Sequence, residues 1–463
     1  MREFDIVVIG GGPGGYVAAI RGAQMGAKTA VVERDRVGGT CLNRGCIPTK
    51  ALYYSARTLT AVKKAQRFGV SVAEASFDMA VAVDRKDEVV KRLVGGVEQL
   101  LKGNGVELLR GNGRLDGAGK VVVERDGATE TLLAKNVIIA TGSEPAEIAA
   151  FNMDRENVLT STEMLDIRKV PESLLVIGAG VMGCEFATIF AKFGSRVTMV
   201  ELLPAILSTE DRQVVRTVMK SFKAMGVEVL TGVGVEEVEV RDGSVRTVVS
   251  GGREITTEKV LVSIGRRFNS GGLGLETAGV ETERGRIKVN ERMETNVPGI
   301  YAIGDVTGGM LLAHTASAEG GVAAANAMGG SAAMSYDAVP AGIFTDPEIA
   351  SVGLREKTAA EQGMDVKVGR FPYAACGKAL AMDETEGFVQ VVADPGTDRV
   401  LGCTIVGAHA TDLIGEVALA VRSGAKVRDI TGTIHAHPTL PEVVLEAAED
   451  VHGLAVHKVG RRR

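Results

Sequence analysis

The chain has 463 residues, more than a single hydrophobic core usually holds, and this length predicts two to four domains. The net charge of −5 gives no electrostatic reason to expect a nucleic-acid partner. No apolar run is long enough to span a bilayer, and a strand predicted at residues 4–9 leaves no room for a signal peptide. We therefore expect a cytoplasmic protein, in which a persistent disulfide would be catalytic.

A strand, a glycine-rich turn, a helix and a second strand open the chain. The first strand covers residues 5–9, and the second covers residues 29–32 and ends in Glu33. The turn between the first strand and the helix contains Gly10, Gly12 and Gly15. In a dinucleotide-binding βαβ unit, the first glycine makes the tight turn, the second admits a pyrophosphate and the third lets helix and strand pack closely. Glu33 is then expected to bind ribose hydroxyls.

Two cysteines, Cys41 and Cys46, follow this unit. In a regular helix their Cα atoms would be roughly 8–9 Å apart, beyond disulfide reach. A disulfide therefore requires an irregular backbone between them, which Gly45 permits. A bond across so short a loop is expected to be strained and redox-active. The alternative is a pair of buried thiols or half a metal site, although no other cysteine or histidine cluster lies nearby.

The βαβ pattern recurs further along the chain, with strands at residues 174–177 and 197–200 and with Glu201 at the end. Its glycines are Gly178, Gly180 and Gly183. One such match alone is compatible with an ordinary glycine turn. Two matches, each between a strand and a helix and each with its acid, predict two dinucleotide sites. A carboxylate at 201 would repel a 2′-phosphate and no arginine follows at once, so we expect NAD rather than NADP.

Five further motifs extend over nearly the whole chain. They are Ala140–Pro145, Ser263–Arg267, Thr295–Asp305, Phe344–Glu348 and His435–Glu442. Together with the glycine turns and the cysteine segment, they resemble the flavin-dependent pyridine nucleotide-disulfide oxidoreductases, and among these most closely the dihydrolipoamide dehydrogenases. The resemblance implies FAD and NAD as cofactors, a redox-active Cys41–Cys46 disulfide, and no metal.

The resemblance also assigns residues to the two cofactors. Asp305 follows a short apolar strand and looks like the ligand of the flavin ribityl chain, at the sheet edge where ligands bind in open α/β folds. Lys50 and Glu185 match positions that pair close to the flavin, where a cation stabilises negative charge on the reduced ring. The other positions implied are Gly113, Gly142 and Ala313 for FAD, and Gly265 for NAD.

The C-terminal motif predicts acid–base chemistry. A thiol substrate needs a base at neutral pH, and imidazole is suited to that task. By resemblance, His437 is the base and Glu442 is the carboxylate that orients it and stabilises its imidazolium form. His435 is expected to shape the turn.

The predicted fold is α/β, with two Rossmann-like domains and a C-terminal α+β dimerisation domain that includes a strand at residues 401–407. An FAD-binding domain is expected to take residues 1–145 and 270–335, an NAD-binding domain 146–269, and the dimerisation domain 336–463. The resemblance implies a homodimer in which each active site takes its histidine from the other subunit.

The implied reaction is the oxidation of dihydrolipoyl groups on acyltransferase or H-protein lipoyl domains, with reduction of NAD+. Two alternatives remain open: an NAD(P)H-dependent reductase of another small disulfide, and a non-catalytic flavin- and NAD-binding sensor or scaffold. The lack of basic residues after the second βαβ unit argues against the first, and the retained Cys41, Cys46 and His437 argue against the second. Arg44 departs from the family pattern, and we expect it to alter the disulfide potential or to favour an acidic substrate.

Overall fold

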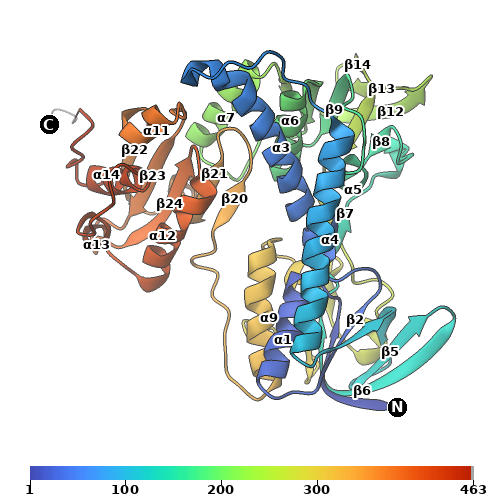
Figure 1. The fold of residues 1–463 in the computed structure, drawn as a ribbon. Helices are drawn as coiled ribbons and strands as arrows, with labels where there is room; N and C mark the ends of the chain where they lie inside the picture. The colour runs from blue at the N-terminus through green and yellow to red at the C-terminus, as the bar shows by residue number, and fades with distance from the viewer. Residues whose placement is uncertain (460–463) are drawn as a thin grey trace. The chain divides into compact units, whose positions relative to one another are not determined.

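The computed structural model describes residues 1–459, which form two compact units (Figure 1). The first unit comprises Met1–Val170 and Val262–Ser335, and the second comprises Pro171–Leu261 and the chain from Tyr336 onward. The second unit thus joins the segment expected to bind NAD to the C-terminal segment. The three-domain division remains a prediction. No helix within residues 1–459 is long and apolar enough to cross a membrane.

The first unit is built on a sheet with strand order β3-β2-β1-β6-β5-β4, to which β19 adds alongside β6. Strands β3, β2, β1, β6 and β19 run parallel, whereas β4, β5 and β6 form antiparallel pairs. The strands are β1 (Arg2–Ile9), β2 (Thr29–Glu33), β3 (Glu107–Arg110), β4 (Asn112–Leu115), β5 (Lys120–Arg125), β6 (Ala128–Ile139) and β19 (Ile300–Ala302).

The central strand β1 is buried on both faces, as expected for a parallel strand between two neighbours. Its successive side chains enter two different hydrophobic clusters: Val7 and Ile9 belong to one, whereas Ile6 and Val8 belong to the other. This alternation follows from the two-residue period of a strand. The sheet therefore has a core on each face, and its parallel strands end together at one edge.

Helices and short strands complete the first unit, and α1 packs closely along α9 (Figure 1). The helices are α1 (Pro13–Gln24), α2 (Gly39–Arg44), α3 (Cys46–Lys64), α4 (Met79–Gly103), α5 (Ser161–Met164), α8 (Leu275–Ala278) and α9 (Ala313–Ala327). The short strands are β7 (Ser143–Pro145), β8 (Val158–Leu159), β16 (Arg266–Phe268), β17 (Thr282–Glu283) and β18 (Arg286–Ile287). β7 and β16 form an antiparallel pair.

The second unit contains a second βαβ sheet, in which β9 and β11 flank β10 in parallel and β15 adjoins β9. Beside it lies an antiparallel sheet of β12, β13 and β14. The elements are β9 (Ser173–Ile177), α6 (Val181–Phe193), β10 (Arg196–Glu201), α7 (Arg212–Ala224), β11 (Glu228–Thr231), β12 (Val235–Arg241), β13 (Ser244–Val249), β14 (Arg253–Thr257) and β15 (Lys259–Val262).

The C-terminal part of this unit is an antiparallel sheet with the order β20-β21-β24-β23-β22, packed against α12 and α14. The predicted strand at 401–407 is confirmed as β24 (Val400–Val406). The α/β class with a C-terminal α+β part is likewise confirmed. The remaining elements are β20 (Ala341–Ile343), β21 (Ile349–Gly353), α10 (Glu356–Glu361), β22 (Lys367–Pro372), α11 (Gly377–Ala381), β23 (Phe388–Ala393), α12 (Ala410–Ser423), α13 (Val427–Thr431) and α14 (Glu442–Asp450).

Candidate functional site

The first glycine turn links β1 to α1. Gly10 has a φ of +105°, which favours glycine, and a Cβ atom on Gly15 would lie 1.9 Å from the Gly10 carbonyl oxygen. Glu33, at the end of β2, accepts hydrogen bonds from the backbone N–H groups of Gly11 at 2.7 Å and Asp35 at 2.8 Å. Burial raises the pKa of Glu33, and the Gly11 N–H group opposes this. The carboxylate thus ties the turn to the next strand.

The second glycine turn has the same construction in the other unit. Gly178 has a φ of +99°, and a Cβ atom on Gly183 would lie 2.0 Å from the Gly178 carbonyl oxygen. Glu201 accepts from the N–H groups of Ala179 at 2.6 Å and Leu203 at 2.8 Å. In both predicted βαβ units, therefore, the first glycine has a positive φ, the third lies against the carbonyl oxygen of the first, and the acid lies beside the turn.

Space for a pyrophosphate is left at the middle glycine of each turn. A Cβ atom on Gly180 would meet no atom within 4 Å, and one on Gly12 would meet only the Gly39 Cα atom at 3.8 Å. Within residues 1–459, no side chain caps the start of α1 or of α6. The first-turn N–H groups of both helices therefore suit a phosphate ligand. These residues fit the dinucleotides FAD and NAD.

The two cysteines lie on either side of a break between helices. Cys41 belongs to α2, Cys46 begins α3, and Gly45 between the helices has φ −141° and ψ −113°. The predicted irregularity is thus confirmed. A Cβ atom on Gly45 would lie 2.9 Å from the carbonyl oxygen of Thr40, which limits this position to glycine.

The Cys41 and Cys46 thiols are hydrogen-bonded to each other. The hydrogen bond with Cys46 and burial raise the pKa of the Cys41 thiol, and the positive charge of Lys50 acts in the opposite direction. Lys50 lies one turn into α3. Arg44, between the cysteines, forms an ion pair with Asp35. Its charge is therefore already partly neutralised.

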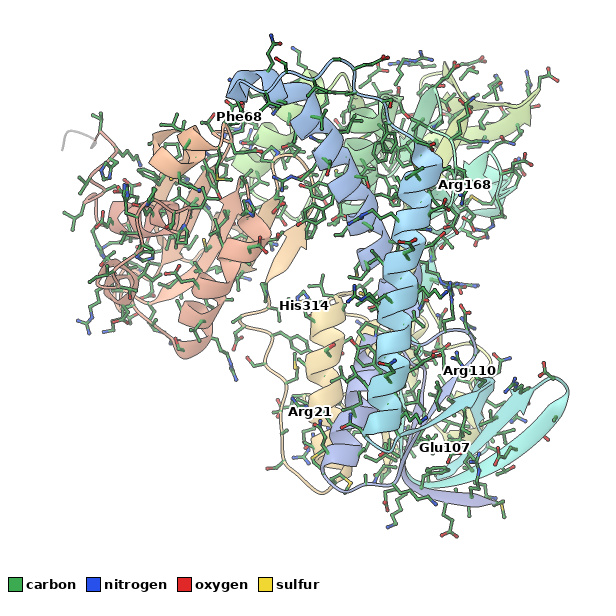
Figure 2. The ribbon with its side chains drawn as sticks, in the orientation of Figure 1. Arg21, Phe68, Glu107, Arg110, Arg168 and His314 are labelled. Atoms are coloured by element: carbon green, nitrogen blue, oxygen red, sulfur yellow. The ribbon has the colours of Figure 1, made fainter. Side chains whose placement is uncertain are left out.

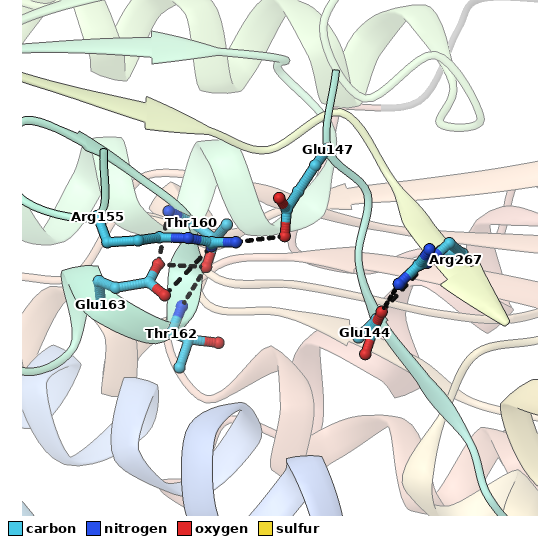
Figure 3. Close-up of polar contacts among 7 residues, drawn as sticks. All are labelled: Glu144, Glu147, Arg155, Thr160, Thr162, Glu163 and Arg267. Carbon is cyan, nitrogen blue, oxygen red and sulfur yellow. Dashed lines mark hydrogen bonds and ion pairs between the residues drawn. The ribbon is translucent and has the colours of Figure 1, made fainter. Parts of the chain in front are cut away.

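Asp305 lies just after β19 and belongs to a small, half-buried network. The Ser143 hydroxyl donates to Asp305 at 2.5 Å, and the Arg266 guanidinium donates to the Ser143 hydroxyl at 2.6 Å. Burial lowers the pKa of Arg266, and Asp305 opposes this. Sequence reasoning missed Ser143 and Arg266 as site residues, although both lie in quoted motifs. Figure 3 shows the next residues of the same two strands, where Glu144 pairs with Arg267.

The other residues expected at the flavin lie in the same unit. Gly113 in β4 faces the ends of β1 and β2, since a Cβ atom there would lie 2.9 Å from Val32 and 3.1 Å from Ile9. Gly142 has a φ of +69°, and Ala313 begins α9. Figure 2 marks His314 at the start of this helix. Gly265, which was expected at NAD, also lies in this unit and has a φ of +119°.

His437 and Glu442 form the predicted pair in the second unit. His437 Nδ1 lies 2.8 Å from Glu442 Oε1, and the Thr439 N–H group donates to Glu442 Oε2 at 2.7 Å. Although desolvation opposes it, these two hydrogen bonds lower the pKa of Glu442, so the carboxylate stays ionised. With Nδ1 donating, Nε2 is left as the acceptor. The His437 side chain is 78% exposed, so this nitrogen is accessible.

His435 has a structural environment by contrast. Its side chain is 5% exposed, with Nε2 at 3.0 Å from Glu416 and Nδ1 at 2.9 Å from the Thr433 carbonyl oxygen.

Glu185 in α6 is buried and accepts from the Phe344 N–H group at 3.0 Å. Because Lys50 and Glu185 belong to different units, their pairing remains a prediction.

Comparison with known proteins identifies the family of this chain. Residues 4–320 match the family model of the pyridine nucleotide-disulphide oxidoreductases, and residues 339–448 match the dimerisation domain of that family. The chain belongs to this family. It is accordingly an α/β flavoprotein disulfide oxidoreductase that uses FAD and NAD, and it carries the family's dimerisation domain. Within residues 1–459, no group of three or more His, Cys, Asp or Glu side chains could hold a metal ion.

Family relatives and solved structures cover nearly the whole chain. The dihydrolipoyl dehydrogenase of Thermus scotoductus is 46% identical over 100% of both chains, and that of Bacillus subtilis is 43% identical over 98% of this chain and 99% of its own. Among solved structures, LpdA of Mycobacterium tuberculosis superposes with a TM-score of 0.92 at 28% identity, covering 97% of this chain and 99% of its own. The HOCl-induced flavoprotein disulfide reductase RclA of Escherichia coli gives 0.88 at 27% identity, with coverages of 97% and 99%.

Proposed function

We propose that this chain oxidises protein-bound dihydrolipoyl groups to lipoyl groups and reduces NAD+ to NADH. The observation that carries the proposal is the contact between the Cys41 and Cys46 thiols across the break at Gly45, in the unit that holds the flavin turn. Full-length relatives named dihydrolipoyl dehydrogenase support the substrate.

The chemistry begins with Cys41 and Cys46 joined as a disulfide. His437 Nε2 takes the proton from one substrate thiol, and the resulting thiolate attacks Cys41, which releases Cys46 as a thiolate. The second substrate thiol then attacks the substrate sulfur of the mixed disulfide and gives its proton to Cys41, so that the cyclic lipoyl disulfide leaves and Cys41 is reduced to a thiol. The substrate loses two electrons and two protons, and both electrons reside on the cysteine pair. Bound FAD supplies the two-electron transfer from this pair to NAD+.

The side chains around the cysteines and the histidine have supporting roles. Glu442 holds the His437 tautomer in which Nε2 accepts the proton, and it stabilises the imidazolium that forms. Lys50 opposes the rise in the pKa of Cys41, so it favours the thiolate. Asp305 binds the flavin ribityl chain, and Glu201 binds the NAD ribose. Lys50 and Glu185 act as a pair beside the flavin.

The remaining parts of the proposal concern assembly and location. The dimerisation domain joins two copies into a homodimer in which His437 of one subunit serves the cysteines of the other. The partners are lipoyl domains of acyltransferases or of H-protein, and the enzyme works in the cytoplasm. A monomeric variant would then hold FAD yet lack turnover.

Steady-state NADH formation with dihydrolipoamide tests the proposal, with Cys41→Ser, Cys46→Ser and His437→Gln measured beside the unaltered protein. We expect rapid turnover that both cysteine variants lose, and little turnover with NADP or with reduced glutathione. Cys403→Ala is a suitable control because Cys403 is a buried core residue of β24. If the FAD-loaded protein does not turn over dihydrolipoamide, the substrate assignment is refuted. That result would favour a reductase of another disulfide, as the E. coli disulfide reductase RclA is named.

A further inference from the structure

Three acidic residues on one face of α14 each bind a basic side chain. Glu442, Glu446 and Asp450 are spaced four residues apart, so they follow one another along successive helical turns. Glu442 binds His437 at 2.8 Å, Glu446 binds His457 at 2.5 Å, and Asp450 binds Lys458 at 2.6 Å. The same helix face therefore holds the loop of the catalytic base and the C-terminal segment 454–459, here called the tail.

The second pair repeats the geometry of the first. In both, one carboxylate oxygen binds Nδ1 of a histidine and the other accepts a backbone N–H group. For Glu442 that group belongs to Thr439, and for Glu446 the groups belong to Val456 and His457, at 3.0 Å and 3.2 Å. The Glu446 side chain is only 9% exposed. A carboxylate this buried needs its partners, because an unpaired buried charge is costly.

We propose that the His457–Glu446 pair is a positioning device for the base His437, because it fixes the tail along α14 and places a cation one helical turn from Glu442. This inference rests on the proposed role of His437. The hydrogen bond with Glu446 raises the pKa of His457, and Glu442 also contributes to that rise. Desolvation acts to raise the pKa of Glu442, but the hydrogen bonds from Thr439 and His437 outweigh it and lower that pKa. The charge of His457 makes a smaller contribution in the same downward direction.

Other charged groups lie on α14 and on the elements packed against it. The elements packed against α14 are β22, β23 and α13. Arg370 of β22 binds Glu356 and Gln390, and Asp429 of α13 accepts from the Lys426 N–H group. On α14 itself, burial and the negative charge of Glu446 raise the pKa of Glu449. The positive charge of His457 acts in the opposite direction. Apart from His437, His457 is the cation whose charge lowers the pKa of Glu442.

The test is the pH profile of kcat/KM for dihydrolipoamide, measured on the FAD-loaded full-length protein. His457→Gln leaves Glu446 as an unpaired negative charge, which stabilises the protonated base. The midpoint of the acid limb should then move upward by roughly 0.4 pH unit, the size expected for unit charges about 8 Å apart in water. His457→Lys restores the cation and should restore the midpoint, and so should the double variant His457→Gln/Glu446→Gln, which removes the unpaired carboxylate.

Two further measurements separate charge from packing. The shift in His457→Gln should shrink in about 1 M salt, where the screening length is about 3 Å, whereas a purely structural effect would persist. His452→Gln is the matched control, because His452 pairs with Asp398, which lies outside α14, at 2.9 Å. It should leave the midpoint unchanged.

The outcomes distinguish this inference from the proposed function. If His437→Gln retains full turnover, the assignment of the base is wrong and the proposed mechanism fails. If His437→Gln is inactive but His457→Gln has the midpoint of the unaltered enzyme, only the positioning role is overturned. An upward shift that His457→Lys does not reverse would also overturn it.

Discussion

Glu33 and Glu201 occupy equivalent positions in the two units of the structure. Each carboxylate accepts the backbone N–H group one residue after the first glycine of its turn, at 2.7 Å from Gly11 and 2.6 Å from Ala179. Each also accepts the N–H group two residues beyond itself, at 2.8 Å. The acid of a βαβ unit thus fixes the glycine turn, and lone pairs remain for the proposed ribose hydroxyls because a carboxylate has about four.

Replacing each of these two acids with glutamine should affect one cofactor site and leave the other unchanged. Glu201→Gln removes the charge that repels a 2′-phosphate, so we expect the ratio of kcat/KM for NADP to that for NAD to rise about 10- to 100-fold. Glu33→Gln makes the same change at the first turn. It should weaken FAD retention and leave the NADP to NAD ratio unaltered, as measured by flavin fluorescence and steady-state rates. Equal effects of both variants on the ratio would contradict the assignment.

Gly45 should be intolerant of any side chain. In Gly45→Ala the new Cβ atom would lie 2.9 Å from the Thr40 carbonyl oxygen, and the clash should cost about 1–3 kcal/mol of unfolding free energy. It should also slow dihydrolipoamide turnover, because the two thiols move apart. Gly95→Ala in α4 is the matched control, since no atom lies within 4 Å of its added Cβ atom. That variant should stabilise the protein by up to about 1 kcal/mol.

Removing the Ser143 hydroxyl should weaken flavin binding. Ser143→Ala leaves Asp305 without the donor that orients it, so we expect a roughly tenfold higher FAD dissociation constant, equivalent to about 1.4 kcal/mol. The control is Glu144→Gln on the same strand, which breaks the exposed ion pair with Arg267 (Figure 3). Surface pairs contribute little, and that variant should keep the FAD affinity of the unaltered protein. An equal loss in both would assign the effect to β7 as a whole.

The tail should loosen as pH rises. Because the pKa of His457 is raised in the folded protein, its contribution is fully present below the ordinary value of 6.5 and is lost as pH rises through the higher folded-state value. Hydrogen exchange at the Val456 and His457 amides, corrected for intrinsic rates, should therefore show protection near pH 6 that falls by about pH 9. His457→Lys should keep its protection over this range. Protection independent of pH in the unaltered protein would contradict the role of the imidazolium.

Local sequence alone determined both βαβ units, the irregular backbone between the cysteines and the strand at 400–406. The reason is that glycine spacing, apolar runs and helix geometry act over short stretches of chain. The pairing of His437 with Glu442 was predicted by resemblance, and the structure places the two in contact.

Only the tertiary structure decided which distant residues share a network. Ser143, Arg266 and Asp305 are separated by more than one hundred residues from first to last, and they meet because β7 pairs with β16 near the end of β19. Glu446 and His457 meet because the chain turns back along α14, and nothing in their spacing of eleven residues predicts that contact. These contacts depend on how the folded chain packs, and the local sequence pattern around each residue does not predict them.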